Sequence, residues 1–205
     1  MDAAALRASW SDAWRALDAS PDDAVLAELL ARYGEAHRAY HTLQHLGECL
    51  AHLARERGGA ERPAEVALAL WFHDAIYDVH RHDNEARSAD WARQAALGAG
   101  LAPDVAERLH ALVMATRHDT QPVGTDARLL VDIDLAILGA SPARFAEYER
   151  QIRGEYGHVP PAVFEPRRRQ ILGGFLARDP IYLTAPMRAR LEAAARANLG
   201  RAVAG

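Results

Sequence analysis

The chain has 205 residues, half of them apolar and a quarter charged, which is an ordinary balance for a globular protein large enough to bury one core. A net charge of -4 excludes the polycationic surface that binds a nucleic-acid polymer. No apolar stretch reaches the ~18 residues that cross a bilayer. The single cysteine, Cys49, excludes an intramolecular disulfide, and the N-terminus does not resemble a signal peptide, so we expect a cytoplasmic protein.

Helical periodicity begins at the N-terminus. Apolar residues three and four apart predict an opening helix, along Leu6, Trp10, Trp14 and Leu17. Aromatic residues exposed on this helix would leave a homodimer possible. The run Ser20-Pro21-Asp22-Asp23 is typical of a helix start, with a capping hydroxyl, a proline and acids in the first turn. A second helix should extend from there to about Tyr33.

Prolines and glycines divide the rest of the chain into further helices. The predicted helices cover approximately 42–57, 63–75, 84–97, 103–116, 126–138, a segment begun by Ser141-Pro142, 161–177 and 186–199. Residues 76–83 and 118–125 lack periodicity and should be loops, and residues 201–205 should form a frayed tail. Because no β-branched alternation predicts a sheet, we expect a single all-α domain, a helical bundle over residues 1–205.

Three short segments carry side chains suited to metal chemistry. They are Tyr40-His41-Thr42-Leu43-Gln44-His45, Trp71-Phe72-His73-Asp74 and Leu129-Leu130-Val131-Asp132-Ile133-Asp134-Leu135. Imidazole and carboxylate groups bind Zn, Mn, Fe and Co. Ionisable groups at the end of a buried helix cost several kcal/mol unless they are paired or bound to a metal. The chain has no lysine, so the cation for a buried acid must be an arginine or a metal.

The order His, then His-Asp, then Asp resembles the signature of the HD superfamily of metal-dependent phosphohydrolases. The segments RAYHTLQHL, WFHDAIYD, DNEARSAD, DIDLAILG, IRGEY and ARANLG are similar to a small bacterial branch described as predicted metal-dependent HD phosphohydrolases. This resemblance spans about Trp10 to Leu199. It implies an all-α fold of the HD-domain type and a divalent metal ion (Mn, Fe, Co, Zn or Mg). The implied ligands are His45, His73, Asp74 and an acid of the third segment, for which we choose Asp134, with Asp132 as a group that orients a ligand or an arginine.

The first segment also resembles the Tyr-His-Asn-x-x-His motif of cyclic-nucleotide phosphodiesterases, with Thr42 in place of the asparagine. By this resemblance His41 would donate a proton to the leaving group of a small phosphorylated substrate. Asp78 is our candidate for orienting the attacking water, and Glu85 is its alternative.

Two further residues are candidates for substrate binding. Arg38 precedes the first segment, and His118 lies where many HD proteins place an additional histidine.

Two other functions remain open. One is an HD-fold oxygenase with two irons, for which His118 together with His80 or His82 would supply extra ligands. The other is a non-catalytic helical module that binds a nucleotide or a protein partner.

Overall fold

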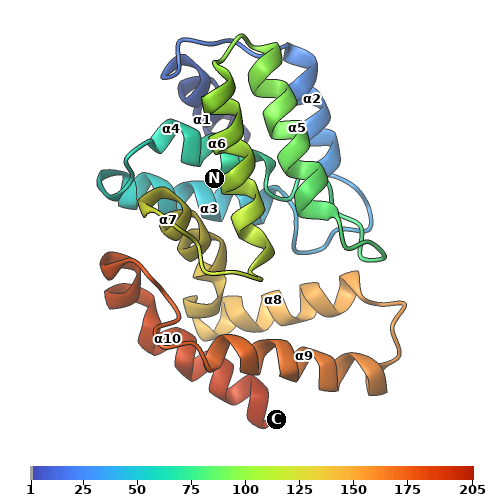
Figure 1. Cartoon of the computed structure of the whole chain (residues 1–205). Helices are drawn as coiled ribbons and strands as arrows, with labels where there is room; N and C mark the ends of the chain where they lie inside the picture. The colour runs from blue at the N-terminus through green and yellow to red at the C-terminus, as the bar shows by residue number, and fades with distance from the viewer. Residues whose placement is uncertain (1) are drawn as a thin grey trace. The chain divides into compact units, whose positions relative to one another are not determined.

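A computed structural model describes residues 2–205, and these residues are all-helical, without a β-strand (Figure 1). The prediction of the all-α class is therefore confirmed. The chain divides into a first compact unit that ends at Val131 and a second that extends from Asp132 to Gly205. The prediction of one domain over residues 1–205 stays a prediction. The α-helices are α1 (Ala3–Arg15), α2 (Asp23–Tyr33), α3 (Leu43–Glu56), α4 (Pro63–Phe72), α5 (Asn84–Gly98), α6 (Pro103–Met114), α7 (Thr125–Asp134), α8 (Pro142–Glu155), α9 (Pro161–Leu176) and α10 (Ala185–Ala204). The 3-10 helices are η1 (Arg57–Gly59), η2 (Ala115–Arg117) and η3 (Leu135–Gly139).

Helix α4 is the central element of the first unit. Every residue from Glu65 to Phe72 is buried, and the helix packs against α1, α3, α5 and α6. A helix that is apolar on all sides is stable only when other elements surround it. Helices α5 and α6 lie side by side in Figure 1 and complete this packing. Because α4 ends at Phe72, the residues that follow it, His73 and Asp74, lie at a fixed position at the edge of this core.

An aromatic cluster joins α1 to α4. The ring of Trp10 packs edge-on against Trp14 and Trp71, with centroids 5.4 and 5.3 Å apart, and lies 5.9 Å from Phe72. Such pairs add roughly 0.5–1.5 kcal/mol each beyond their burial. Both tryptophans of α1 are buried in this cluster. The exposed aromatic residues on which the possible homodimer was based are therefore absent from the described α1.

The second unit is built on the pair α9 and α10, with η3 packed against α8 and α10. Gly139, the last residue of η3, lies so close to α10 that a Cβ there would be 2.7 Å from the Cβ of Leu191. The side-chain amide of Asn198 donates to the carbonyl oxygens of Leu138 and Ala140, at 2.9 Å each. These contacts fix the end of η3 against α10.

Three predicted boundaries were wrong. Helix α4 ends at Phe72 rather than Ala75, because the chain turns more tightly there, with the Ala75 amide donating to the Phe72 carbonyl oxygen at 2.9 Å. The predicted helix 126–138 is split at Asp134 into α7 and η3. Helix α10 continues to Ala204, so the predicted tail is helical over most of its length, and Leu199, the residue before Gly200, is fully buried. Packing therefore overrides Gly200 as a stop signal.

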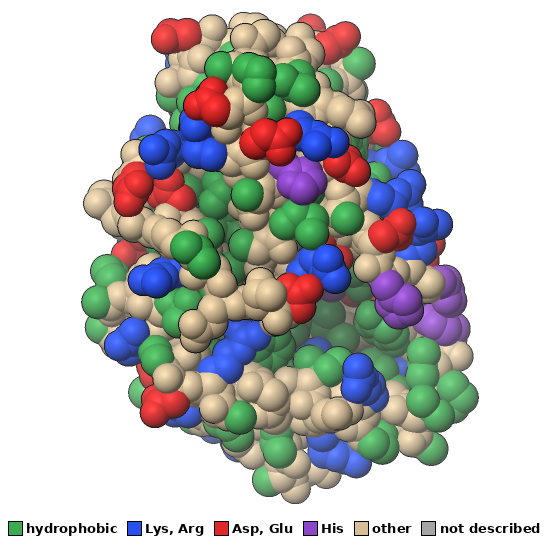
Figure 2. Space-filling view, viewed as in Figure 1, with side chains coloured by type: hydrophobic (Ala, Val, Ile, Leu, Met, Phe, Trp, Pro, Cys, Tyr) green, Lys and Arg blue, Asp and Glu red, His purple; other side chains and the backbone are tan. Residues whose placement is uncertain are grey.

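Charges of both signs are interspersed over the face of the molecule in Figure 2, with no broad area of one sign. This distribution agrees with the net charge of -4. None of the helices in residues 2–205 combines the length and the hydropathy that crossing a membrane requires.

Candidate metal centre

Three of the four predicted metal ligands lie in the first unit, one on α3 and two directly after α4, and these two helices pack together. His45 is in the first turn of α3, which Thr42 begins by accepting a hydrogen bond from the Gln44 amide at 3.3 Å. His73 and Asp74 directly follow α4, and α3 packs against α4. Residues that are 28 positions apart in the sequence are therefore brought to one point.

The ligand atoms of these residues converge. The Nε2 atoms of His45 and His73 are 3.1 Å apart, and Asp74 Oδ2 is 2.9 Å from His73 Nε2 and 3.5 Å from His45 Nε2. Atoms that each lie ~2.0–2.2 Å from one ion stand roughly 2.8–3.6 Å apart in tetrahedral or octahedral geometry. The side chains are 3%, 1% and 18% exposed for His45, His73 and Asp74. The spacing fits three ligands of a single cation.

The protonation of the His73 ring is determined by its second nitrogen. His73 Nδ1 lies 2.7 Å from the carbonyl oxygen of Leu70, which can only accept a hydrogen bond, so Nδ1 carries the proton. In the neutral ring the Nε2 lone pair then faces the buried Asp74 Oδ2 at 2.9 Å. Two electron pairs at 2.9 Å repel each other unless a proton or a metal ion lies between them. A hydrogen bond from the second nitrogen to a carbonyl is also the usual support of a metal-binding histidine.

Electrostatics at this point favour a charged carboxylate. Burial alone would raise the pKa of Asp74, but the neighbouring His73, His41 and His45 outweigh burial and lower it below its usual value. The carboxylate is thus ionised and available as an anionic ligand at neutral pH.

Arg38 lies beside the centre but faces the backbone. Its side chain is 0% exposed, and its guanidinium donates to the carbonyl oxygens of His41, Asp74 and Ala75, the last at 3.1 Å. It also donates to the Glu35 carboxylate at 3.0 Å. These contacts tie the segment before α3 to the segment after α4. Arg38 was predicted as a substrate-binding residue, whereas its position is that of a residue that holds the ligand-bearing segments in place.

The structure places His41 next to the predicted ligands. Its ring is half-buried, stacks on Tyr77 with centroids 4.0 Å apart and lies edge-on to His45 at 6.1 Å. His41 is also close enough to lower the pKa of Asp74. This location is compatible with the predicted proton donor, and the stack on Tyr77 fixes the orientation of the ring.

The other predicted residues of the first unit lie in the loop after α4, in the first turn of α5 and after η2. The Asp78 carboxylate accepts a hydrogen bond from the His80 amide at 2.9 Å, and the Asn84 side chain hydrogen-bonds the backbone amide and carbonyl of Asp78. The Asp78 carboxylate therefore helps to hold the loop between α4 and α5. Glu85 is in the first turn of α5, where an acid stabilises the positive end of the helix dipole. His118 follows η2 in the left-handed conformation, with φ of 56°, and is half-buried. Roles for these residues in catalysis or substrate binding stay predictions.

The two acids of the third segment belong to the second unit. Asp132 is buried, and its oxygens accept hydrogen bonds from the amides of Leu183 and Thr184 at 2.8 and 2.7 Å and from the Thr184 hydroxyl at 2.6 Å. Burial raises the pKa of Asp132, and these hydrogen bonds oppose the increase. Asp132 therefore anchors the start of α10. Asp134 is the last residue of α7, and its assignment as the fourth ligand stays a prediction.

Sequence reasoning did not include Cys49 in the site. Cys49 is one helical turn after His45 on α3, and its sulfur is 3.7 Å from His45 Nδ1. The spacing of four residues was a sufficient signal, because it places both side chains on one face of the helix.

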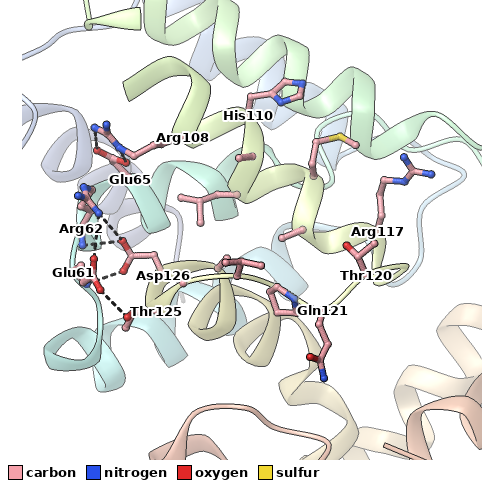
Figure 3. Close-up of a pocket in the computed structure, with 18 of the residues that line it drawn as sticks. Glu61, Arg62, Glu65, Arg108, His110, Arg117, Thr120, Gln121, Thr125 and Asp126 are labelled. Carbon is pink, nitrogen blue, oxygen red and sulfur yellow. Dashed lines mark hydrogen bonds and ion pairs between the residues drawn. The ribbon is translucent and has the colours of Figure 1, made fainter. Parts of the chain in front are cut away.

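A cavity of about 740 Å³ opens elsewhere in the first unit, between the start of α4, α6 and the start of α7 (Figure 3). Glu65 and Arg108 form a two-fold ion pair at its edge, with oxygen to nitrogen distances of 2.7 and 2.8 Å. The Asp126 carboxylate accepts hydrogen bonds from the backbone amides of Glu61 and Arg62. The described lining contains none of the residues predicted for the site, so the cavity does not extend the candidate metal centre.

Comparison with known proteins identifies no relative: no protein-family model, no curated protein and no solved structure matches the chain.

Proposed function

We propose that His45, His73 and Asp74 bind a divalent metal ion and that the protein is a metal-dependent hydrolase of a small phosphate ester. The observation that carries the proposal is the convergence of two buried imidazole nitrogens and one buried carboxylate oxygen within 3.5 Å of one another. The resemblance to HD phosphohydrolases supplies the reaction class, and Asp134 is kept from that resemblance as the fourth ligand.

The metal and the residues have separate tasks in this proposal. A bound divalent ion would lower the pKa of a bound water and neutralise charge on the phosphoryl oxygens. His41, held by its stack on Tyr77, would donate a proton to the leaving oxygen. Asp78 would accept a hydrogen bond from the attacking water. Arg38 would keep His41 and Asp74 in register through their carbonyl oxygens.

Metal content is the direct test. We expect His45→Ala and Asp74→Ala to abolish retention of metal while circular dichroism remains that of a folded helical protein. His110→Ala is the matched control, because His110 is a histidine of the same unit, on α6, with no predicted role at the site. Normal metal content in either ligand variant, measured by mass spectrometry of the purified protein, would contradict the assignment.

The reaction class requires a second experiment. The protein is reloaded with each candidate metal and screened against phosphomonoesters and phosphodiesters. Turnover that Asp74→Ala removes supports the proposal. Two bound irons with oxygen-dependent turnover would instead establish the oxygenase, and nucleotide binding that survives Asp74→Ala without any turnover would establish the non-catalytic module.

A further inference from the structure

The sulfur atom of Cys49 lies against the histidine pair of the candidate metal centre. Cys49 is 2% exposed, and its sulfur is 3.7 Å from Nδ1 and 3.8 Å from Nε2 of His45. The ligand atoms of His45, Cys49 and His73 all lie within 4.8 Å of one another. The three side chains thus form a compact, buried group of two nitrogens and one sulfur.

Local structure explains why the sulfur is there. His45 and Cys49 are separated by four residues on α3, so they occupy the same face of this helix one turn apart. The buried face of α3 packs on α4, which brings His73 to the same place. A rigid helix therefore presents both a nitrogen and a sulfur donor, and no loop has to rearrange for the sulfur to approach an ion.

The chemistry of the donors distinguishes two classes of metal ion. Thiolate is a soft ligand that prefers Zn²⁺ and related ions, whereas carboxylate and water suit Mg²⁺ and Mn²⁺. The histidine pair has Asp74 Oδ2 as one additional neighbour and the sulfur of Cys49 as another. With Asp74 Oδ2 as the only further ligand, the centre would also accept hard ions such as Mg²⁺. The sulfur of Cys49 adds a preference for soft ions that His45, His73 and Asp74 do not provide.

We propose that Cys49 is a ligand of the metal ion, bound as a thiolate after its proton is released to solvent, and that it makes the centre selective for thiophilic divalent ions. This inference rests on the metal centre proposed above. The ions that fit are Zn²⁺, Co²⁺ and Fe²⁺, and Mg²⁺ and Mn²⁺ should be bound more weakly.

Titration of the metal-free protein with Co²⁺ tests the proposal directly. A thiolate bound to Co²⁺ gives a charge-transfer absorption band in the near ultraviolet. Because the chain has a single cysteine, such a band can come only from Cys49. We expect the band in the wild-type protein and its loss in Cys49→Ser and Cys49→Ala, with visible cobalt bands retained in both variants through the other ligands.

Affinity measurements by competition with a chelating dye give the selectivity. We expect Zn²⁺ affinity to fall by at least about tenfold in Cys49→Ser, the low end of what loss of a supporting group costs a metal site. Mn²⁺ affinity should change by less than about threefold, because Mn²⁺ gains little from sulfur.

The outcomes separate this inference from the proposed function. Cobalt bound to the wild-type protein without a charge-transfer band would overturn the role of Cys49 and leave the other ligands intact. Unchanged zinc affinity in both Cys49 variants would overturn it equally. Binding of Mn²⁺ or Mg²⁺ without binding of Co²⁺ or Zn²⁺ by the wild-type protein would overturn the role of Cys49 alone, and failure to bind any of the candidate metals would overturn both proposals. If both variants fail to fold, the wild-type spectrum alone decides.

Discussion

The hydrogen bonds of Asp132 predict a large effect on stability from one substitution. Asp132→Ala removes the acceptor of two backbone amides and one hydroxyl, all between 2.6 and 2.8 Å from the carboxylate. Each amide left without an acceptor costs about 1–3 kcal/mol, and relief of the buried charge offsets part of this loss. We therefore expect the free energy of unfolding to fall by about 3 kcal/mol.

A matched substitution calibrates this estimate. Thr184→Val keeps the shape of the side chain and removes only the hydroxyl bond to Asp132 Oδ2, so it should cost about 1 kcal/mol. Metal content should be unchanged in both variants, since Asp132 is engaged at the start of α10. This pair also tests our choice of Asp134 over Asp132 as the ligand of the third segment.

The assay is urea denaturation followed by far-ultraviolet circular dichroism. Fluorescence is unsuitable, because all four tryptophans lie in residues 10–91 and do not report on the second unit. The shift of the midpoint at constant slope gives the loss of stability. A loss below about 1 kcal/mol for Asp132→Ala would refute the reasoning from its hydrogen bonds. Loss of metal from Asp132→Ala at unchanged stability would identify Asp132 as a ligand.

Two further substitutions test the packing around the site and within the second unit. Arg38→Ala should lower both the free energy of unfolding, by about 3 kcal/mol, and zinc affinity, because three carbonyl oxygens lose a buried donor. If Arg38→Ala instead keeps wild-type stability and zinc affinity but has a raised KM, the predicted role of Arg38 in substrate binding would be supported. Gly139→Ala should cost about 2 kcal/mol in urea denaturation, since its new Cβ would be 2.7 Å from the Leu191 Cβ. Gly58→Ala is its control, with no atom within 4 Å of the new Cβ, and equal losses in the two variants would contradict the steric argument.

Local signals in the sequence predicted the helices apart from some of their boundaries, and the resemblance to HD phosphohydrolases grouped His45, His73 and Asp74. The run Ser20-Pro21-Asp22-Asp23 correctly predicted that a helix starts there, but the cap is the Asp22 carboxylate, which accepts a hydrogen bond from the Ala24 amide at 2.8 Å, and not the predicted Ser20 hydroxyl. The pair His73-Asp74 was predicted at the end of a buried helix and lies there, with His45 against it. These features depend on residues within a few positions of one another or on a pattern that the sequence displays directly.

Contacts between distant residues account for the features that were missed. The burial of Arg38 depends on carbonyl oxygens 36 and 37 positions away, which carry no side-chain signal. The extension of α10 past Gly200 depends on packing of Leu199 and on the bonds of Asn198 to η3. The early end of α4 coincides with a tight turn, in which the Ala75 amide donates to the Phe72 carbonyl oxygen. Helix propensity contains none of this information.

The contacts of Arg38 make the two segments unequal in their tolerance of sequence change. The Arg38 guanidinium donates hydrogen bonds to main-chain carbonyl oxygens, which every amino acid provides. Replacing Ala75 by another small residue should therefore leave the hydrogen bonds of Arg38 intact. A lysine at position 38 cannot reproduce them, because it lacks the planar guanidinium that reaches several acceptors. As far as these contacts are concerned, substitutions at Ala75 should be tolerated and substitutions of Arg38 should not.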